Sequence, residues 1–139
     1  MKKILVMCTG NSCRSQMAEG YLRHFAQGRA EIYSAGVLST FVNPMAIQVM
    51  AEDGIDISQH TSNHVNDYLD IPFDALITVC NHAQESCPIF PGQTKTFHHN
   101  FFDPSHVPGT EEERLFLFRR TRDEIKVYCQ QWVKENLIG

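Results

Sequence analysis

A cysteine followed after five residues by an arginine and a serine is the most chemically suggestive pattern in this sequence. The stretch begins at Cys8 and reads Cys8-Thr9-Gly10-Asn11-Ser12-Cys13-Arg14-Ser15. A short loop of this kind directs successive backbone N–H groups into one hollow, where they can bind a tetrahedral oxyanion. Arg14 would add a planar guanidinium that donates to two anion oxygens.

Cys8 is the nucleophile that this pattern predicts. An apolar run, residues 4–7, precedes it, and a helix-like segment follows Ser15. The order strand, loop, helix places the positive end of a helix dipole beside the sulfur and favours the thiolate. We expect Ser15 to donate a hydrogen bond to that sulfur. Gly10 and Asn11 tolerate the positive φ angles that such a loop demands. The alternative is a buried cysteine at a strand end beside a surface arginine.

Two later cysteines form a second candidate group. Cys80 follows an apolar run, residues 73–79, and Cys87 lies seven positions further on. In a helix the two sulfurs would share a face but lie about 10 Å apart along the axis. A disulfide needs Cα atoms within about 7 Å of each other. The polar residues 81–86 have little apolar content to hold a helix, so the pair is interpreted either as a redox relay with a movable member or as two unconnected thiols.

The remaining candidates are an aspartate and two cysteines. Pro104 holds the preceding Asp103 in an extended conformation, where it is either a general acid for a departing oxygen or a turn aspartate. Cys13 lies inside the loop, where we expect it to fill space, although it could pair with Cys8 under oxidation. Cys129 lies on the apolar side of the last predicted helix and is interpreted as a core residue.

A metal site is not predicted. The sequence has seven histidines, of which His60 and His64 are four positions apart and His98 and His99 are adjacent. No grouping of carboxylates or cysteines completes a tetrahedral ligand set around them, and there is no Cys-x2-Cys pair. We therefore expect neither a metal nor another cofactor.

Length and composition limit the class of protein. The 139 residues suit one domain, residues 1–139, with a core of its own, and 42% of them are hydrophobic. The net charge of −4 argues against a general nucleic-acid binder. No apolar run approaches the roughly 18 residues of a membrane span, and the run at the N-terminus is too short for a secretion signal. Five cysteines fit poorly with a static disulfide framework, so we expect a cytoplasmic protein.

The pattern of apolar and capping residues predicts a parallel α/β fold. The expected strands cover residues 4–7, 31–34, 73–79 and 94–98, the last at an edge, and the expected helices cover 14–25, 44–53, a short stretch at 63–68, and a long segment after Thr110. Asn43 and Pro44 mark one helix start, and Thr110 with Glu113 forms a capping box at another. The result is a three-layer sandwich in which a four-stranded parallel sheet is flanked by helices. Ligands bind beyond the carboxyl ends of such strands, so Cys8 and Cys80 are expected at one rim.

Together these stretches resemble the thioredoxin-coupled arsenate reductases, which share the low-molecular-weight protein tyrosine phosphatase fold. The resemblance covers nearly the whole chain. The Cys80 and Cys87 pair separates the reductase from the phosphatase. The matching residues are 8–20, 33–36, 43–44, 56–58, 61–62, 78–80, 87–88, 103–104 and 122–125.

This resemblance implies a mechanism in which arsenate, or phosphate or sulfate in its place, binds to loop residues 9–15. Cys8 attacks arsenic while Asp103 assists loss of an oxygen as water. Cys80 then attacks the Cys8 sulfur, arsenite leaves, and Cys87 attacks Cys80 to free Cys8. Thioredoxin, or glutaredoxin with glutathione, would reduce the final Cys80–Cys87 disulfide. We expect a monomer that contacts neither nucleic acid nor membrane.

The sequence departs from the family pattern at one position, and two alternative functions remain open. Some members of the family hold a potassium ion with an Asn, a Glu, a Ser and an Asp, and the matching positions here are Asn11, Glu19, Ser34 and Asn63. Because Asn63 replaces the carboxylate, we do not predict a strong potassium site. The alternative functions are a phosphatase, disfavoured because Ser-His-Val rather than an aromatic residue follows Pro104, and a non-catalytic thiol switch.

Overall fold

The computed structural model describes residues 1–137, so the last two residues of the expected domain 1–139 lie outside the described range. Strands and helices alternate along most of the chain, as the apolar pattern predicts. In chain order the elements are β1 (Lys2–Cys8), α1 (Arg14–Ala26), β2 (Ala30–Gly36), α2 (Pro44–Glu52), the 3-10 helix η1 (Val65–Tyr68), β3 (Ala75–Thr78), α3 (Asn81–Glu85), β4 (Lys95–His98), the 3-10 helix η2 (Pro104–His106) and α4 (Glu111–Asn136).

The four strands form one parallel sheet in the order β2-β1-β3-β4. The predicted four-stranded parallel sheet and the edge position of β4 are confirmed. From β1 the chain moves outward to β2 on one side, whereas β3 returns to the other side of β1. This reversal opens a crevice between the carboxyl ends of β1 and β3, which is where open α/β sheets bind their ligands.

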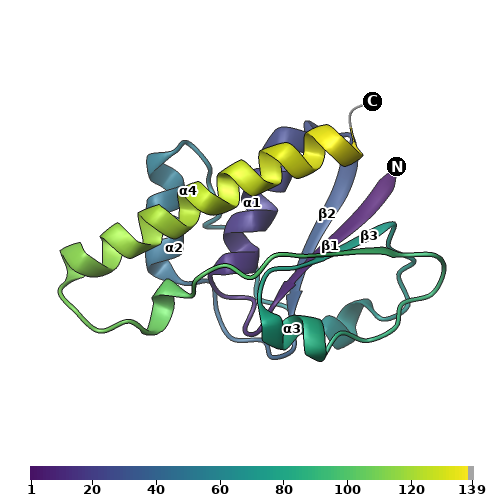
Figure 1. Ribbon diagram of the computed structural model, residues 1–139, viewed down its shortest axis with the longest axis horizontal. Helices are drawn as coiled ribbons and strands as arrows, with labels where there is room; N and C mark the ends of the chain where they lie inside the picture. The colour runs from purple at the N-terminus through teal and green to yellow at the C-terminus, as the bar shows by residue number, and fades with distance from the viewer. Residues whose placement is uncertain (138–139) are drawn as a thin grey trace.

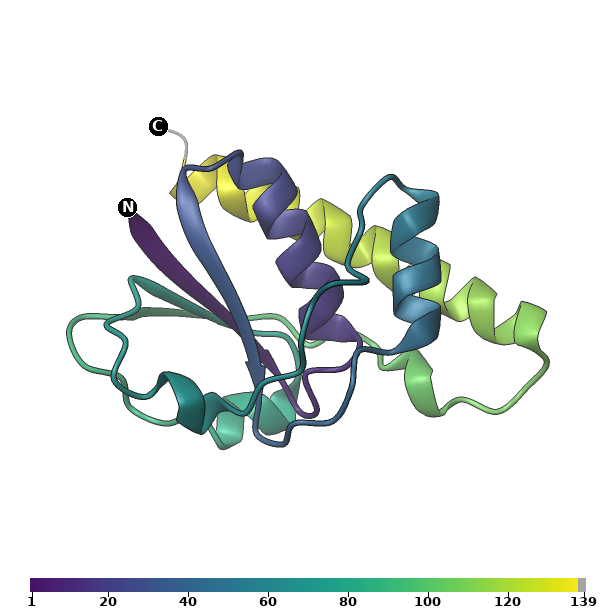
Figure 2. The same cartoon turned by 180° about the vertical axis from the view of Figure 1, so that it is seen from behind.

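Helices and loop segments cover the two faces of the sheet. The views from the two sides show α1, α2 and α4 gathered together, with α4 crossing α1 (Figures 1 and 2). Ser34 of β2 faces α1 because its hydroxyl donates to Glu19. The neighbouring Tyr33 points to the opposite face, where its ring packs edge-on against Tyr68 and Phe73. The apolar strands are therefore buried on both sides, as in other parallel sheets.

The helix starts that the sequence predicts are present. The Asn43 side chain accepts hydrogen bonds from the N–H groups of Met45 and Ala46 at 2.8 and 3.3 Å, and Pro44 is the first residue of α2. At α4 the Thr110 hydroxyl accepts from the Glu113 N–H, and the Glu113 carboxylate accepts from the Thr110 N–H. Both caps satisfy backbone donors that a helix start leaves without partners.

Three elements differ from the predictions. The strand expected at 73–79 is assigned only over Ala75–Thr78, although the Val79 N–H still donates to the Met7 carbonyl at 2.9 Å. The short helix near 63–68 is a 3-10 turn that begins after His64. Residues 81–86, expected as a polar mobile segment, form helix α3 over Asn81–Glu85. Within residues 1–137, no helix is long and apolar enough to cross a membrane.

Candidate active site

The loop between β1 and α1 turns its carbonyl groups away from its own hollow. The carbonyl oxygen of Thr9 accepts from the Leu38 N–H, that of Ser12 from the Asn43 N–H, and that of Gly10 from the hydroxyls of Thr40 and Ser62. A peptide N–H points opposite to its carbonyl, so these outward bonds aim the N–H groups of the loop inward. The predicted oxyanion hollow is therefore held from outside by the segments that follow β2 and α2.

The backbone of the loop depends on one residue with a positive φ and on one close contact. Of the two residues that tolerate a positive φ, Asn11 adopts one, at 48°, and Gly10 does not. Gly36, the last residue of β2, lies directly behind the loop. A Cβ built there would lie 2.6 Å from the Thr9 oxygen and 2.7 Å from the Asn11 nitrogen. The backbone of the loop therefore packs directly against the backbone of Gly36, where there is no room for a side chain.

A directed hydrogen bond reaches the sulfur of Cys8. The Cys8 Sγ lies 2.8 Å from the Ser15 Oγ, in a site where Ser15 has no exposed surface. The Asn11 Nδ2 donates to the same Ser15 oxygen at 2.8 Å, and the Asn63 N–H fixes the Asn11 side chain by donating to its Oδ1. Because Ser15 Oγ accepts from Asn11, its own proton is free to point at sulfur. This geometry is the one that stabilises a thiolate.

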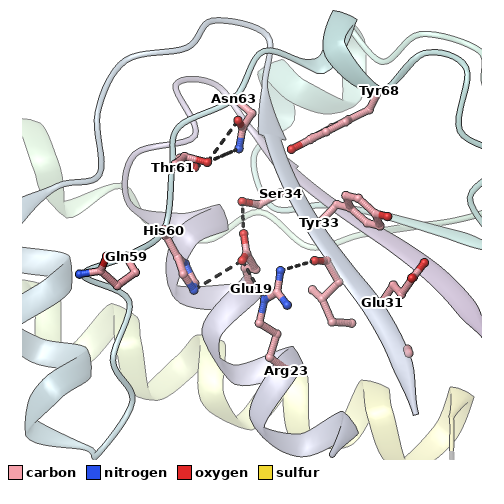
Figure 3. Close-up of a pocket in the computed structure, with 12 residues that line it drawn as sticks. Glu19, Arg23, Glu31, Tyr33, Ser34, Gln59, His60, Thr61, Asn63 and Tyr68 are labelled. Carbon is pink, nitrogen blue, oxygen red and sulfur yellow. Dashed lines mark hydrogen bonds and ion pairs between the residues drawn. The ribbon is translucent and has the colours of Figure 1, made fainter. Parts of the chain in front are cut away.

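The same network continues to a buried carboxylate behind the loop. The Asn11 Nδ2 also donates to the Ser34 Oγ at 3.0 Å, and the Ser34 hydroxyl donates to Glu19. Figure 3 shows Glu19 between Ser34, His60 and Arg23, at the edge of a cavity of about 690 Å³. The Asn11 amide donates one proton to Ser15 and one to Ser34, and the Ser34 hydroxyl donates its proton to Glu19. The donor and acceptor of every hydrogen bond from Glu19 to Cys8 are therefore fixed.

The arrangement around Glu19 does not fit a potassium ion. The Arg23 Nε lies 2.9 Å from the Glu19 carboxylate, and the His60 Nε2 lies 3.5 Å from it. The Asn63 side chain turns to Thr61 instead, donating to its carbonyl at 3.1 Å. The guanidinium of Arg23 therefore already supplies the positive charge that a cation would provide. Among residues 1–137, no group of three His, Cys, Asp or Glu side chains is placed to hold a metal ion.

Arg14 and Asp103 meet at the mouth of the loop. The Arg14 Nη1 donates to the Phe101 carbonyl at 2.9 Å, and its Nη2 lies 3.5 Å from the Asp103 Oδ2. Burial raises the pKa of Asp103, but hydrogen bonds from the Ser105 hydroxyl and N–H, with the charges of Arg14 and His106, outweigh this and lower the pKa. Asp103 is therefore ionised beside Arg14 when no anion is bound.

The structure brings Cys80 to the rim of the loop but leaves Cys87 further out. The Cys80 Sγ lies 3.3 Å from the Oγ1 of Thr9, the residue after Cys8, and accepts from the Ala83 N–H at the start of α3. Cys80 is buried, whereas Cys87 is partly exposed and its Sγ donates to the Pro88 carbonyl. All five cysteines are free thiols, so the sulfurs are in the reduced state.

The other two cysteines lie in the core. Burial raises the pKa of Cys13 well above its usual range, with further contributions from the negative charges of Asp103 and Cys8. Burial also raises the pKa of Cys129, whose Sγ lies 3.8 Å from the Ala18 carbonyl. Both are protonated and unreactive at neutral pH, in keeping with the packing roles that the sequence suggests.

The anion loop lies at the bottom of a cavity of about 860 Å³. The sequence did not predict part of the wall of this cavity, which comes from the segment after β2 and from the first turn of α4. Leu38 and Phe41 are 58% and 62% exposed there, and Arg114 contributes a guanidinium whose Nε is buried without a hydrogen-bond partner within residues 1–137. No local signal marks these residues, because only the tertiary fold gathers them around Cys8.

The protein has a four-stranded parallel sheet, and an oxyanion loop that begins with a nucleophilic cysteine follows the first strand. These features define a phosphatase-type α/β protein. Residues 3–137 match the family model of the low molecular weight phosphotyrosine protein phosphatases. The chain belongs to this family.

Relatives within the family show where the chain lies in it. An arsenate reductase of Halalkalibacterium halodurans is 45% identical over 124 residues, which is 89% of each chain. The structure of an arsenate reductase in the oxidized state superposes with a TM-score of 0.81 at 33% identity, covering 99% of this chain and 97% of that one. Another, in the phosphate binding state, gives a TM-score of 0.74 at 29% identity, covering 97% and 98%.

Proposed function

We propose that this protein reduces arsenate to arsenite through three thiols, Cys8, Cys80 and Cys87. The observation that carries the proposal is the position of Cys80, whose sulfur lies 3.3 Å from the Thr9 hydroxyl at the rim of the anion loop. A phosphatase needs only the loop, its cysteine and an acid. A reductase also needs a second thiol near the loop that holds the first, and a third that follows the second closely in the chain. The similarity to arsenate reductases over most of the chain supports this reading.

The first step joins Cys8 to arsenic. Arsenate accepts hydrogen bonds from the N–H groups of residues 9–15 and from Arg14, which must then release Asp103. Negative charge from the bound anion raises the pKa of Asp103, so that this carboxyl can hold the proton that the departing oxygen needs. The Cys8 thiolate attacks arsenic, an S–As bond forms, and one oxygen leaves as water. Phosphate would occupy the same loop as a competitor.

The second step moves two electrons to arsenic. The Cys80 thiolate attacks the Cys8 sulfur, the S–As bond breaks with its electron pair going to arsenic, and arsenite leaves. A Cys8–Cys80 disulfide remains. The Cys87 thiolate then attacks the Cys80 sulfur, and Cys8 departs as a thiolate. The first attack is a displacement at the Cys8 sulfur with arsenite as the leaving group, and the second is an ordinary thiol–disulfide exchange. In total, the two electrons come from the Cys80 and Cys87 thiols.

Thioredoxin is the reductant that we propose for the final disulfide, and no cofactor is required on this chain. Cys87 is the partly exposed thiol of the pair, and Ile89, two residues later, is 97% exposed. An apolar side chain beside the outer sulfur gives a protein reductant a surface to contact. The protein would act as a monomer, because each step uses residues of one chain.

A coupled assay tests the proposal. NADPH loss is followed with arsenate, thioredoxin and thioredoxin reductase, for the wild type and for Cys8→Ser, Cys80→Ser and Cys87→Ser. We expect multiple turnovers in the wild type and none in the three variants. Full activity in Cys87→Ser would contradict the relay, and oxidation without turnover in the wild type would favour a thiol switch. Replacing thioredoxin with glutaredoxin and glutathione identifies the electron donor.

A second activity is favoured by one feature of the cavity. The residues after Pro104 supply no aromatic wall, but Phe41 and Leu38 line the mouth from the other side. An aryl phosphate monoester could pack its ring there while its phosphate occupies the loop. Hydrolysis of para-nitrophenyl phosphate should therefore be slow but measurable, abolished in Cys8→Ser and retained in Cys80→Ser. Loss of hydrolysis in Cys80→Ser would exclude this second activity of the loop.

A further inference from the structure

The first residue of helix α3 is held by two side chains, one from the last residue of β4 and one from the segment that follows it. The Asn81 N–H donates to the Asn100 Oδ1 at 3.1 Å, and the Asn81 Oδ1 lies 2.8 Å from the His98 Nε2. The peptide that carries this N–H joins Asn81 to Cys80. The Asn100 contact therefore acts on the backbone immediately beside the second sulfur of the relay, and the His98 contact holds the side chain of the same residue, Asn81.

His98 is itself fixed to the sheet. Its Nδ1 lies 2.7 Å from the Oγ1 of Thr78, its partner in the β3–β4 register. Thr78 is buried, so the ring is braced from inside the fold. The Thr78 hydroxyl also lies 3.4 Å from the Phe97 carbonyl. When it donates instead to the nearer Nδ1, the other ring nitrogen carries the proton and donates to Asn81. The imidazole is thus a rigid connection between strand β3 and the start of α3.

The dithiol state places the two outer thiols in separate environments. The Cys80 Sγ contacts the Thr9 hydroxyl and the Ala83 N–H, whereas the Cys87 Sγ donates to the Pro88 carbonyl. Joining them requires Cα atoms within about 7 Å, whereas a helix rises about 1.5 Å per residue. Helix α3 must loosen and Cys80 must leave the rim before the Cys80–Cys87 bond can form.

We propose that His98 and Asn100 are positioning residues that hold Cys80 toward Cys8 in the dithiol state and release it when the Cys80–Cys87 disulfide forms. The proposal rests on the relay proposed above. In the step concerned, the Cys87 thiolate attacks Cys80 of the Cys8–Cys80 disulfide. The Cys80–Cys87 bond forms, the Cys8–Cys80 bond breaks, and Cys8 leaves with the electron pair, so that no external oxidant enters.

The two contacts stabilise only the dithiol form, so they set the reduction potential of the Cys80–Cys87 pair. Loss of one neutral hydrogen bond should favour the disulfide about threefold, and loss of both about tenfold. For a two-electron couple a tenfold change is a potential about 30 mV more negative. A residue that served only general stability would leave this potential unchanged while lowering the melting temperature.

The experiment measures that potential in full-length protein carrying Cys8→Ser, which isolates the outer pair and needs no arsenate. Samples are equilibrated in buffers of reduced and oxidised dithiothreitol, alkylated, and scored by mass spectrometry. We expect the shift in Asn100→Ala, and the larger one when His98→Phe is added. Asn100→Asp keeps an oxygen acceptor for the Asn81 N–H and should restore the parent potential. His82→Gln, an exposed change on the same helix, is the matched control.

The outcomes separate this proposal from the relay itself. If the disulfide forms in every variant with one unchanged potential, the positioning role of His98 and Asn100 is wrong and the relay stands. If Cys80 and Cys87 form no disulfide in the parent, even in the most oxidising buffer, the relay is wrong and the positioning role with it. A shift in Asn100→Asp as large as in Asn100→Ala would also contradict the proposal, because the acceptor would then be irrelevant.

Discussion

Replacing Ser15 with alanine tests the network behind the nucleophile most directly. The Ser15 hydroxyl lies 2.8 Å from the Cys8 sulfur and has no exposed surface, so water cannot take its place in the variant. A hydrogen bond to a charged group contributes about 1.5 to 3 kcal/mol. Loss of this bond should therefore slow the reaction of Cys8 at neutral pH, by at most about 10- to 150-fold.

The assay is the rate at which iodoacetamide alkylates Cys8, followed by mass spectrometry of the peptide that contains it. Cys80→Ser and Cys87→Ser in the background remove competing thiols near the rim. Ser58→Ala is the control, since its hydroxyl is exposed and bonds only to Asp56 among the described residues. In the relay-competent protein, Ser15→Ala should lower kcat/KM for arsenate by a similar factor. Alkylation within twofold of the parent rate would refute the argument that Ser15 stabilises the thiolate.

Three further predictions follow from the same structure. Asp103→Asn should lower kcat for arsenate about a hundredfold with a smaller effect on KM, measured in the coupled assay; an unchanged kcat would remove it as the acid. Arg114→Gln should weaken phosphate binding severalfold in calorimetry, and more so at low ionic strength. Arg120→Gln, which removes an exposed charge that does not line this cavity, should not. The pKa of Asp53 is lowered by hydrogen bonds from the Lys126 ammonium and a tyrosine hydroxyl, so its contribution to stability is present above the ordinary aspartate pKa and is lost as pH falls through the lowered value. The difference between the melting curves of the wild type and Asp53→Asn should begin to shrink as the pH falls below about 4, and should vanish only below the lowered pKa of Asp53; a constant difference down to pH 2 would contradict this assignment.

Features encoded by adjacent residues could be predicted from the sequence. The loop from Cys8 to Ser15, the Asn43 cap and the Thr110 capping box each depend on neighbours within a few positions, and the structure contains all three. The meeting of Cys8 with the Cys80 segment required one further rule, that parallel strands end at a common edge. That rule sufficed because the strands were recognisable from their apolar runs.

Features that depend on tertiary contacts could not be predicted. Helix α3 contains little apolar surface, and the cap of its first turn is a cysteine sulfur, which is not among the usual capping groups. Its stability comes from contacts with residues about twenty positions away, such as His98 and Asn100. Phe41 and Arg114 likewise approach Cys8 only because the chain folds back on itself. No pattern of spacing within the sequence indicates these contacts.

Gly36 packs so closely against the backbone of the anion loop that the residue at this end of β2 cannot change without affecting the loop. The Cβ of any side chain there would lie 2.4 Å from the Leu38 carbonyl oxygen and 2.7 Å from the Asn11 nitrogen. Both are backbone atoms, so no change of side-chain rotamer could relieve the clash. The identity of this strand residue is therefore constrained both by the segment that directly follows it and by a loop more than twenty positions earlier in the chain. In a library randomised at residue 36 and selected for arsenate resistance, only glycine should survive.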